Sequence, residues 1–320
     1  MKFIAIALAA LSLFFVSSPL QADHKTLNIA QGYIAADILP LWIAIDRNLF
    51  EKHALETTVT YVRGGKNIVA ALLSGQSDMA VILPSSFVLA NLQGADFVFI
   101  GNSHSLLKYV LMAHPSIKAP VELKGKRLAI STVGDLSHAM TLLALQRLGI
   151  GPKELEVIQV GQQPERMLAL RNSSVRATTV SSPFDFMLKK EGFVPLFDSS
   201  NEVRTLATAY IVRQKFLQSA AHRSMAEKFL RAMTEAVRII KTERDYALRV
   251  LDKNLRNTDP EILKYSYDFL APAYHDSPRM KAAEVQTLID LIVPPDKRKE
   301  LSAEKLMDNS LVAKIENGGS

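Results

Sequence analysis

One order of elements occurs twice along this chain, and this repeat constrains the fold more than any other feature of the sequence. When the chain is shifted by 98 positions, Ala71-Leu72 falls on Ala169-Leu170 and Pro84-Ser85-Ser86 falls near Ser181-Ser182-Pro183-Phe184. The preceding runs Leu27–Ala30 and Leu128–Ile130 also resemble each other. Identical residues are few, and the main support is the repeated order of strand, polar loop, helix, strand and serine-rich loop. We therefore predict two similar lobes, one beginning near Thr26 and one near Lys126.

Within the first lobe, short apolar strands alternate with helical segments. Strand patterns cover Thr26–Ala30, Leu55–Val62 and Met79–Leu83, and helical spacing covers Leu39–Leu49 and Asn67–Leu73. This alternation is typical of α/β layers around a sheet with parallel strands. The predicted fold class is α/β, with two similar lobes that contain mixed sheets and are joined by a hinge that the chain crosses twice.

Two further strand patterns predict where the chain passes between the lobes. Tyr109–Met112 leads into a proline-containing segment, and Ala207–Val212 lies beyond the second lobe. We expect residues 23–112 to form the first part of lobe one, residues 113–207 to form lobe two, and residues 208–320 to complete lobe one with C-terminal helices.

The last third of the chain has helical patterns. An amphipathic stripe predicts one helix over Ser224–Leu251. Asp259-Pro260 predicts the start of another, and a third is expected over Lys281–Val293. The segment from Met307 onward is expected to fray.

Residues 1–22 predict an export signal. Lys2 precedes a nearly continuous apolar run over Phe3–Val16, and small residues follow up to Ala22. This order is typical of a secretory signal peptide, and the run is shorter than the ~20 apolar residues that span a bilayer. A retained membrane anchor is the alternative. We expect cleavage near Ala22 and a soluble protein in the periplasm, because no lipid-acceptor cysteine follows the signal.

Composition excludes several kinds of chemistry. The formal net charge is +6 without a block of Lys and Arg, which favours anions weakly and does not indicate nucleic acid. The absence of cysteine removes disulfides, thiolate nucleophiles and cysteine metal sites. The histidines form no H-x-x-x-H pair, and no G-x-S-x-G elbow occurs. We predict no metal, no cofactor and no catalytic residue, a small-molecule solute as partner, and a monomer.

The stretch Ser131–His138 is the strongest candidate for a binding site. It joins an apolar run to a helix, where free N–H groups and the helix dipole favour an anion. Ser131, Thr132 and Ser137 add hydroxyls, Gly134 allows close approach of the backbone, and His138 could contact a ligand. The alternative is ordinary N-capping by Asp135 or Ser137. Asp135 would repel an anion unless it points away or meets a cationic part of the ligand.

Other candidates follow matching strands. Ligands in open α/β sheets lie beyond the C-terminal ends of strands, so a pocket between the lobes would meet several loops. The predicted ligand-binding residues beyond the stretch above are Gln31, Gly32, Tyr33, Trp42, Gly64, Gly65, Pro84, Ser85, Ser86, Ser181, Ser182 and Phe184. Trp42, at helical spacing with Leu41 and Ile45, fits a core position as well as a cleft wall. Glu165-Arg166 is expected to be a solvated helix start.

Several motifs resemble one known family. Pro40–Glu56 is similar to the signature P-L-Y-x-A-x-x-x-G-x-F-x-x-x-G-L of type II periplasmic solute-binding proteins, in the group that binds alkanesulfonates, taurine, nitrate and hydroxymethylpyrimidines. Ala71–Asp78 resembles the family's A-L-x-S-G-x-x-D motif, and Leu123–Arg127 resembles its D-L-K-G-K-R motif. Pro164–Leu170 and Ser181–Phe184 also match, so the resemblance covers roughly Thr26 to Asn254. It implies capture of a solute and delivery to the permease and ATPase of an ABC importer.

The sequence also departs from the family's pattern. Asn48 and Ala54 stand where members usually have glycine, Arg176 replaces an acidic residue, and Thr178-Thr179 replace an apolar pair. We expect a binding protein for a small anionic organic solute, such as a sulfonate or carboxylate. The alternatives are a pyrimidine-precursor-binding protein or a synthase-like enzyme on the same scaffold, and a ligand-binding subunit of a sensor. The export signal and the missing cysteine weigh against the enzyme.

Overall fold

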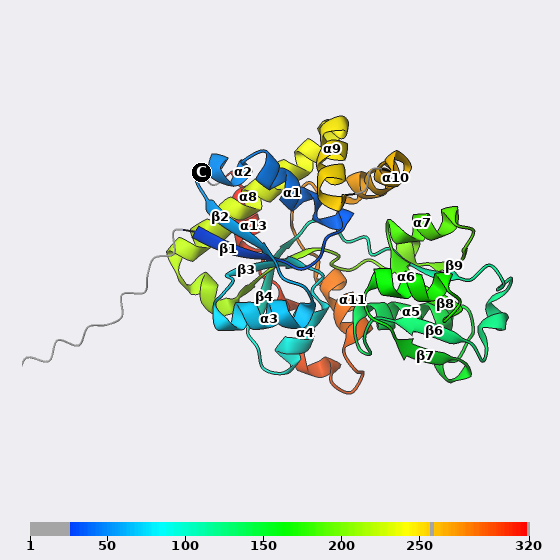
Figure 1. The fold of residues 1–320 in the computed structure, drawn as a ribbon. Helices are drawn as coiled ribbons and strands as arrows, with labels where there is room; N and C mark the ends of the chain where they lie inside the picture. Colours follow the sequence, from blue (N-terminus) through cyan, green and yellow to red (C-terminus); the bar gives the residue numbers. More distant parts are fainter. Residues whose placement is uncertain (1–25, 257–258, 319–320) are drawn as a thin grey trace, which may run out of the picture.

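The computed structural model describes residues 26–256 and 259–318. It contains two five-stranded sheets in two lobes that lie side by side (Figure 1). The predicted signal segment, residues 1–22, lies outside the described residues. None of the helices in the described ranges is long and apolar enough to cross a membrane.

Lobe one contains the sheet of order β2-β1-β3-β10-β4. Its strands are β1 (Thr26–Gln31), β2 (Glu56–Tyr61), β3 (Met79–Ile82), β4 (Phe97–Asn102) and β10 (Ala209–Arg213). Strands β1, β2 and β3 are parallel, whereas β10 runs antiparallel to β3 and β4. The sheet is therefore mixed, as the predicted fold class stated.

Alternating side chains of this sheet supply two cores. Leu27 and Ile29 face one layer of helices, and Ala30 faces the opposite layer. The first layer contains α1 (Leu39–Asp46), α2 (Leu49–Lys52), α8 (Ala220–Thr242), α9 (Arg244–Leu255), α10 (Pro260–Leu270) and α13 (Ser310–Glu316). The opposite layer contains α3 (Gly65–Ser74), α4 (Ser85–Leu92), α11 (Ala282–Ile292) and α12 (Ala303–Leu306).

Lobe two repeats the plan with the sheet β7-β6-β8-β5-β9. Its strands are β5 (Tyr109–Ala113), β6 (Arg127–Ile130), β7 (Glu156–Gln159), β8 (Ala177–Ser181) and β9 (Val194–Asp198), and its helices are α5 (Leu136–Arg147), α6 (Gln163–Arg171) and α7 (Phe184–Lys190). Helix α3 and strand β3 each have a counterpart 98 positions later, in α6 and β8. The internal repeat is thus a structural repeat, and the α/β fold class is confirmed.

One predicted boundary is wrong. Strand β5 pairs with β8 and β9, so Tyr109–Ala113 belongs to lobe two and not to the end of lobe one. The chain crosses between β4 and β5, and it crosses back between β9 and β10. The pattern of residues 109–112 identified a strand correctly, but the choice of sheet depends on partners far away in the sequence.

The N-terminal and C-terminal helices differ from the predicted ranges in three places. Helix α1 ends at Asp46 because Asn48 adopts a left-handed conformation with φ of +51°. The single helix expected over Ser224–Leu251 is two helices that meet at Glu243, where α9 turns to pack on α1. The segment after Met307 does not fray: α13 buries Leu311 and Val312 in the core of lobe one. The helices expected from Asp259-Pro260 and over Lys281–Val293 are confirmed.

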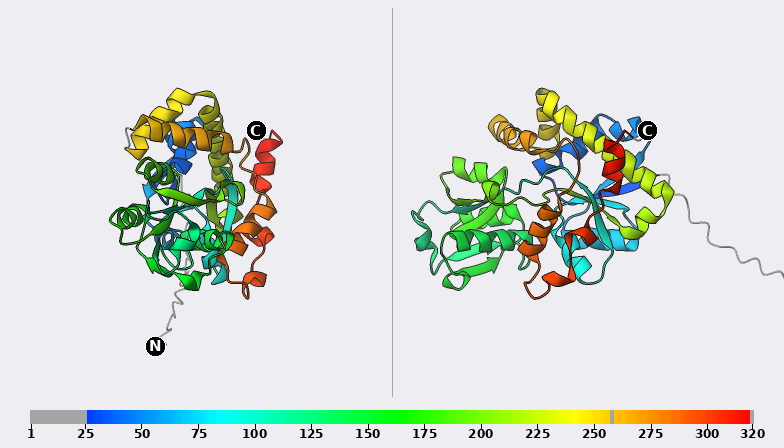
Figure 2. Two further views of the ribbon diagram at one scale, coloured as in Figure 1. Left: turned by 90° about the vertical axis from the view of Figure 1, so that its right-hand side faces the viewer. Right: turned by 180° about the vertical axis from the view of Figure 1, so that it is seen from behind.

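Two helices of lobe one also contact lobe two. Helix α11 packs against α5, and α10 packs against α7, so the lobes touch at two places outside the crossings. Figure 2 shows α11, in orange, beside the second lobe when the molecule is seen from behind. Leu136 and Met140 of α5 share the core that α11 covers.

Candidate functional site

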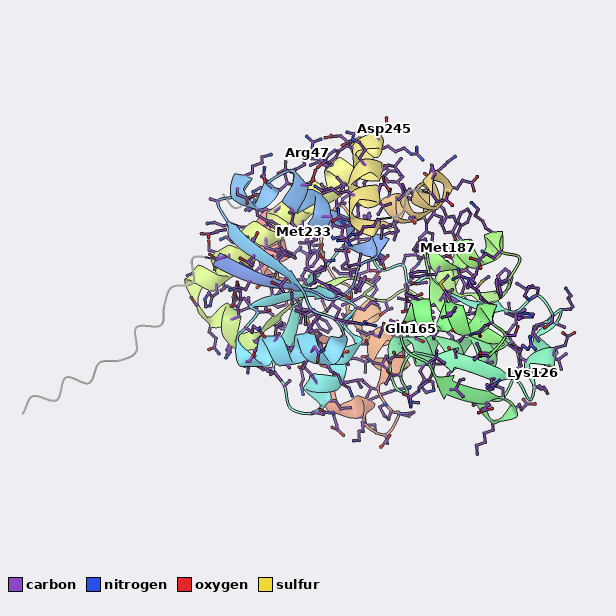
Figure 3. All side chains as sticks on the ribbon, in the orientation of Figure 1. Arg47, Lys126, Glu165, Met187, Met233 and Asp245 are labelled. Atoms are coloured by element: carbon purple, nitrogen blue, oxygen red, sulfur yellow. The ribbon has the colours of Figure 1, made fainter. Side chains whose placement is uncertain are left out.

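A cavity of about 540 Å³ lies between the lobes. Its walls come from the loops that follow the parallel strands β1, β2 and β3 in lobe one and β6, β7 and β8 in lobe two, together with both crossings. This is where open α/β sheets bind ligands, and the volume falls in the range of ~300–1,000 Å³ that is common for small-molecule sites. Glu165 lies on the side of lobe two that faces lobe one, whereas Lys126 lies on the outer side (Figure 3).

Most of the predicted residues lie around this cavity. Those that line it are Gly32, Tyr33, Gly64, Gly65, Ser85, Ser86, Ser131, Ser137, Ser181, Ser182 and Phe184. Six of the predicted residues do not line it: Gln31, Trp42, Pro84, Thr132, Gly134 and His138. The serine-rich loops after β3 and β8 therefore face the same space, as their matching positions predicted.

Trp42 belongs to the core of lobe one. Its side chain is 5% exposed and packs among apolar residues of α1, α8 and α9. Its Nε1 donates a hydrogen bond of 3.3 Å to Oε1 of Gln31, and Nε2 of Gln31 donates to the carbonyl of Tyr33. Gln31 and Trp42 thus lie behind the wall, and Gln31 bonds Tyr33, which lines it.

The start of α5 is capped by its own side chains. Oδ1 of Asp135 accepts a hydrogen bond of 2.9 Å from the backbone N–H of His138, and Oδ2 accepts from the hydroxyl of Ser131. Nδ1 of His138 accepts from the N–H of Gly134, and the hydroxyl of Ser137 accepts from the N–H of Ser131. The capping alternative therefore describes this helix start, and a carboxylate already lies where the sequence suggested an anion.

The prediction that Arg166 is solvated is wrong. The residue is 1% exposed and lies in the cavity wall, while its neighbour Glu165 has a half-exposed side chain. Its guanidinium donates to the hydroxyl of Thr178 at 3.1 Å, to the carbonyl of Gly161 at 2.7 Å and to the carbonyl of Thr179 at 3.0 Å. Among the described residues, no carboxylate lies within 4.0 Å of Arg166.

The unusual pair Thr178-Thr179 explains how this arginine is held. The hydroxyl of Thr178 accepts from Arg166 and donates to the carbonyl of Ala129, and the hydroxyl of Thr179 bonds that of Thr141 in α5 at 2.7 Å. Both threonines are fully buried. The polar pair was the available sequence signal, because a buried hydroxyl in a strand needs a partner.

Lys108 forms the most buried ion pair of the site. Its Nζ lies 3.0 Å from Oδ2 of Asp185, and the two side chains are 9% and 0% exposed. The hydroxyl of Tyr265 donates to the same oxygen at 2.6 Å. The Lys108 ammonium also lies over the ring of Phe269, 4.5 Å from its centroid. Lys108 and Phe269 line the cavity, and neither residue carried a motif that could mark it.

Asp37 also lines the cavity. Burial raises the pKa of its carboxyl to about 7, while its side chain keeps 23% exposure. Nε2 of His104 lies 3.8 Å from Oδ1 of Asp37, but burial lowers the pKa of His104 to about 3, so this ring is neutral. The histidine therefore supplies no positive charge to Asp37 at neutral pH.

Gly65 sets the shape of the wall at the start of α3. A Cβ atom added there would lie 2.0 Å from the hydroxyl oxygen of Ser86 and 2.8 Å from its Cβ. A side chain at position 65 would therefore collide with another lining residue. Within residues 26–256 and 259–318, no group of three His, Asp or Glu side chains is placed to hold a metal ion.

Known proteins resemble this chain along most of its length. A Brucella abortus (strain 2308) protein, BAB2_1146, carries a provisional name as a binding protein and is 28% identical over 228 residues, which is 67% of this chain and 66% of that protein. A solved structure from Bordetella bronchiseptica RB50 has a TM-score of 0.78 at 18% identity and covers 92% of this chain and 98% of that chain.

A second solved structure is that of a sulfonate-binding protein. The periplasmic aliphatic sulphonate binding protein SsuA from Escherichia coli has a TM-score of 0.70 at 21% identity, and the match covers 83% of this chain and 86% of that chain. These likenesses show a shared periplasmic-binding-protein fold. The model of the family described as NMT1/THI5 like matches residues 35–247, and the chain belongs to that family.

Proposed function

We propose that this chain is a periplasmic solute-binding protein that captures a small organic solute with an anionic group and delivers it to an ABC importer. The observation behind this proposal is the cavity between the lobes, because its walls combine loops from the ends of both sheets. A hinge motion at the two crossings would open and close such a cavity. The family, and the sulfonate binding of the related SsuA, support the class of function.

The polar groups of lobe two support an anionic group on the solute. Ser182 is 5% exposed, and its hydroxyl has no hydrogen-bond partner among the described residues. The uncompensated guanidinium of Arg166 lies in the same wall. We propose that the anion lies against Ser182 and Arg166, and that the capped start of α5 supplies no free donor, because the hydroxyl and the N–H of Ser131 already bond Asp135 and Ser137. A hydrogen bond to a charged group contributes ~1.5–3 kcal/mol.

The proposed function also includes export to the periplasm and binding of the solute without a catalysed reaction. Residues 1–22 resemble a signal peptide, which would place the mature chain in the periplasm. Asp37, Lys108 and Arg166 line the cavity, but no serine or other nucleophile there is hydrogen-bonded to a histidine base among the described residues. We therefore propose binding without catalysis.

Recovery of the natural solute tests this proposal. The full chain is exported from its host, purified without washing steps, denatured, and its released small molecules are identified by mass spectrometry. Calorimetry with the identified compound should show one site with about micromolar affinity or tighter, near −8 kcal/mol. Ser182→Ala should weaken binding about tenfold, which corresponds to ~1.4 kcal/mol, while Ser224→Ala on α8 should not.

The remaining functions predict different outcomes. A chemically altered compound after incubation with the pure protein would support a synthase-like enzyme. Unchanged uptake in cells that lack the gene, together with a lost transcriptional response to the compound, would support a sensor subunit. Lost uptake at micromolar supply supports delivery to an importer.

A further inference from the structure

Asp37 is a carboxylate without a counter-ion in the wall of the cavity. It lies in a single helical turn, Ala36–Ile38, directly after β1. Among the described residues, no group donates a hydrogen bond to its carboxylate, and no Lys or Arg lies within 4.0 Å. A partly buried carboxylate in this state is costly to keep, because its lost hydration is not replaced.

The polar neighbours of Asp37 are already committed or neutral. The hydroxyl of Tyr33 bonds that of Thr208 at 2.9 Å, and the hydroxyl of Tyr274 donates to the carbonyl of Ala36 at 3.0 Å. His104 is 1% exposed, and both of its ring nitrogens lack a hydrogen-bond partner among the described residues. No described residue in this part of lobe one compensates the charge of Asp37.

The other charged side chains of the cavity have an ionic partner or hydrogen-bond partners. Lys108 pairs with Asp185 at 3.0 Å, and Arg63 pairs with Glu165 at 3.3 Å where the lobes face each other. In lobe two, Arg166 donates to three oxygens, and the carboxylate of Asp135 accepts two hydrogen bonds. Among the lining carboxylates, Asp37 is the one that has neither a described hydrogen-bond donor nor a described Lys or Arg within 4.0 Å.

We propose that the captured solute is a zwitterion, whose protonated nitrogen binds Asp37 while its anionic group faces lobe two. This inference rests on the proposed capture of a solute between the lobes and adds the second charge. An ammonium or a protonated ring nitrogen would supply the hydrogen bond and the charge that Asp37 lacks. The ring of Tyr33, which lines the same wall, offers such a cation an aromatic neighbour.

A matched pair of probe compounds tests this assignment. Para-aminomethylbenzoate is a zwitterion, and para-hydroxymethylbenzoate has the same shape and anion but carries a hydroxyl in place of the ammonium. Calorimetry and ligand-observed NMR on the full mature chain, at about 10 mM compound, detect even a millimolar Kd. We expect the zwitterion to bind about tenfold or more tightly than the hydroxyl compound. We expect Asp37→Asn to remove that difference.

A control variant and a stability measurement separate recognition from structure. Asp268→Asn makes the same charge change on α10, at an exposed carboxylate that pairs with Arg244 outside the cavity. It should keep the preference for the zwitterion. Asp37→Asn should unfold at the same temperature as the wild type or higher at neutral pH, because it removes an uncompensated charge. A lower unfolding temperature would indicate a structural carboxylate and contradict the assignment.

The outcomes also distinguish this inference from the proposed function. Equal affinity for the two compounds in the wild type would overturn the zwitterion and leave capture of an anion intact. An equal loss of affinity for both compounds in Asp37→Asn would also overturn it, because the carboxylate would then not distinguish the ammonium from the hydroxyl. Failure of para-aminomethylbenzoate to bind at about 10 mM would overturn it as well, while recovery of a solute from the exported protein would still support capture.

Discussion

Lys108 and Asp185 join the crossing between the sheets to helix α7 of lobe two, with Nζ and Oδ2 3.0 Å apart. Tyr265 of α10, in lobe one, donates to the same carboxylate, and its ring stacks on Phe186 with centroids 4.4 Å apart. One buried carboxylate of α7 therefore contacts two other segments, the crossing and α10, that a hinge motion would move relative to it. The stability of this arrangement is open to direct measurement.

Replacing Lys108 by Met should destabilise the fold strongly. Asp185 is fully buried, so the change leaves an uncompensated charge, and breaking such a pair costs about 3–5 kcal/mol. Lys189→Met is the matched control, since Lys189 is 38% exposed and lies 4.0 Å from the same carboxylate. That control should change the free energy of unfolding by less than about 1 kcal/mol. Urea denaturation measures both, and equal effects would contradict a special role for Lys108.

The stability gained by Asp37→Asn should depend on pH. Burial raises the pKa of Asp37 from 3.8 to about 7. Between these values the folded chain holds a proton that the unfolded chain has released, so the contribution of Asp37 is fully present below about pH 4 and is lost as the pH rises to about 7. A pKa shift of this size changes the free energy of unfolding by at most about 4 kcal/mol. The 23% exposure of the side chain makes the actual contribution smaller.

We therefore expect the free energy of unfolding of Asp37→Asn, relative to that of the wild type, to increase by about 1–3 kcal/mol as the pH rises from about 5 to about 8. The measurement is denaturation of both proteins at both pH values. His104 has a lowered pKa and changes stability in the opposite direction, but it is present in both proteins and largely cancels in the difference. A difference that stays constant with pH would contradict the raised pKa of Asp37.

Gly65→Ala should disturb the cavity wall through Ser86. The added methyl group would overlap the Ser86 side chain, and overpacking of this kind costs about 1–3 kcal/mol. Ser86→Gly removes both overlapping atoms, so the double variant should recover most of the loss relative to Ser86→Gly alone. Thermal unfolding of the three variants checks this. Additive effects of the two changes would show that the collision is not the cause.

Ala54→Gly should stabilise the protein. Ala54 is exposed and adopts φ of +53°, a left-handed conformation that favours glycine. A left-handed conformation costs a non-glycine residue roughly 1–2 kcal/mol, and the greater freedom of glycine in the unfolded chain offsets about 0.4–1 kcal/mol. The expected net gain is about 0.5–1 kcal/mol in urea denaturation. Ala283→Gly, on the exposed side of α11, should lower stability instead.

Trp42 should report little of what happens in the cavity. It is the only tryptophan, it is 5% exposed, and it does not line the wall. The emission maximum of the purified protein should be that of a buried indole, with little quenching by acrylamide. It should stay unchanged when the co-purified solute is removed by unfolding and refolding. A clear shift of the emission maximum when the solute is removed would contradict this. It would show that the hydrogen bonds from Trp42 to Gln31 and from Gln31 to Tyr33 couple the indole to the occupied cavity.

Local patterns in the sequence determined the order of elements and the fold class. Apolar alternation and helical spacing are properties of short segments, so β1, α3, β3 and their later counterparts were recognisable without knowledge of the fold. The rule that ligands lie beyond strand ends then placed the serine-rich loops around one cavity. Local reasoning also identified both possibilities for the start of α5, and the hydrogen bonds of Asp135 show that it is capped.

Only the tertiary structure decided which charges are matched. No local pattern shows that Asp37, Lys108 and Arg166 are buried. Their neighbours His104, Asp185 and Thr178 lie in other elements that folding brings near. The same is true of β5, whose pattern fits either sheet, and of the break at Glu243, which depends on α9 meeting α1. Burial and ion pairing depend on the tertiary surroundings of a residue, because desolvation and Coulomb attraction are set by all the atoms that folding brings near it.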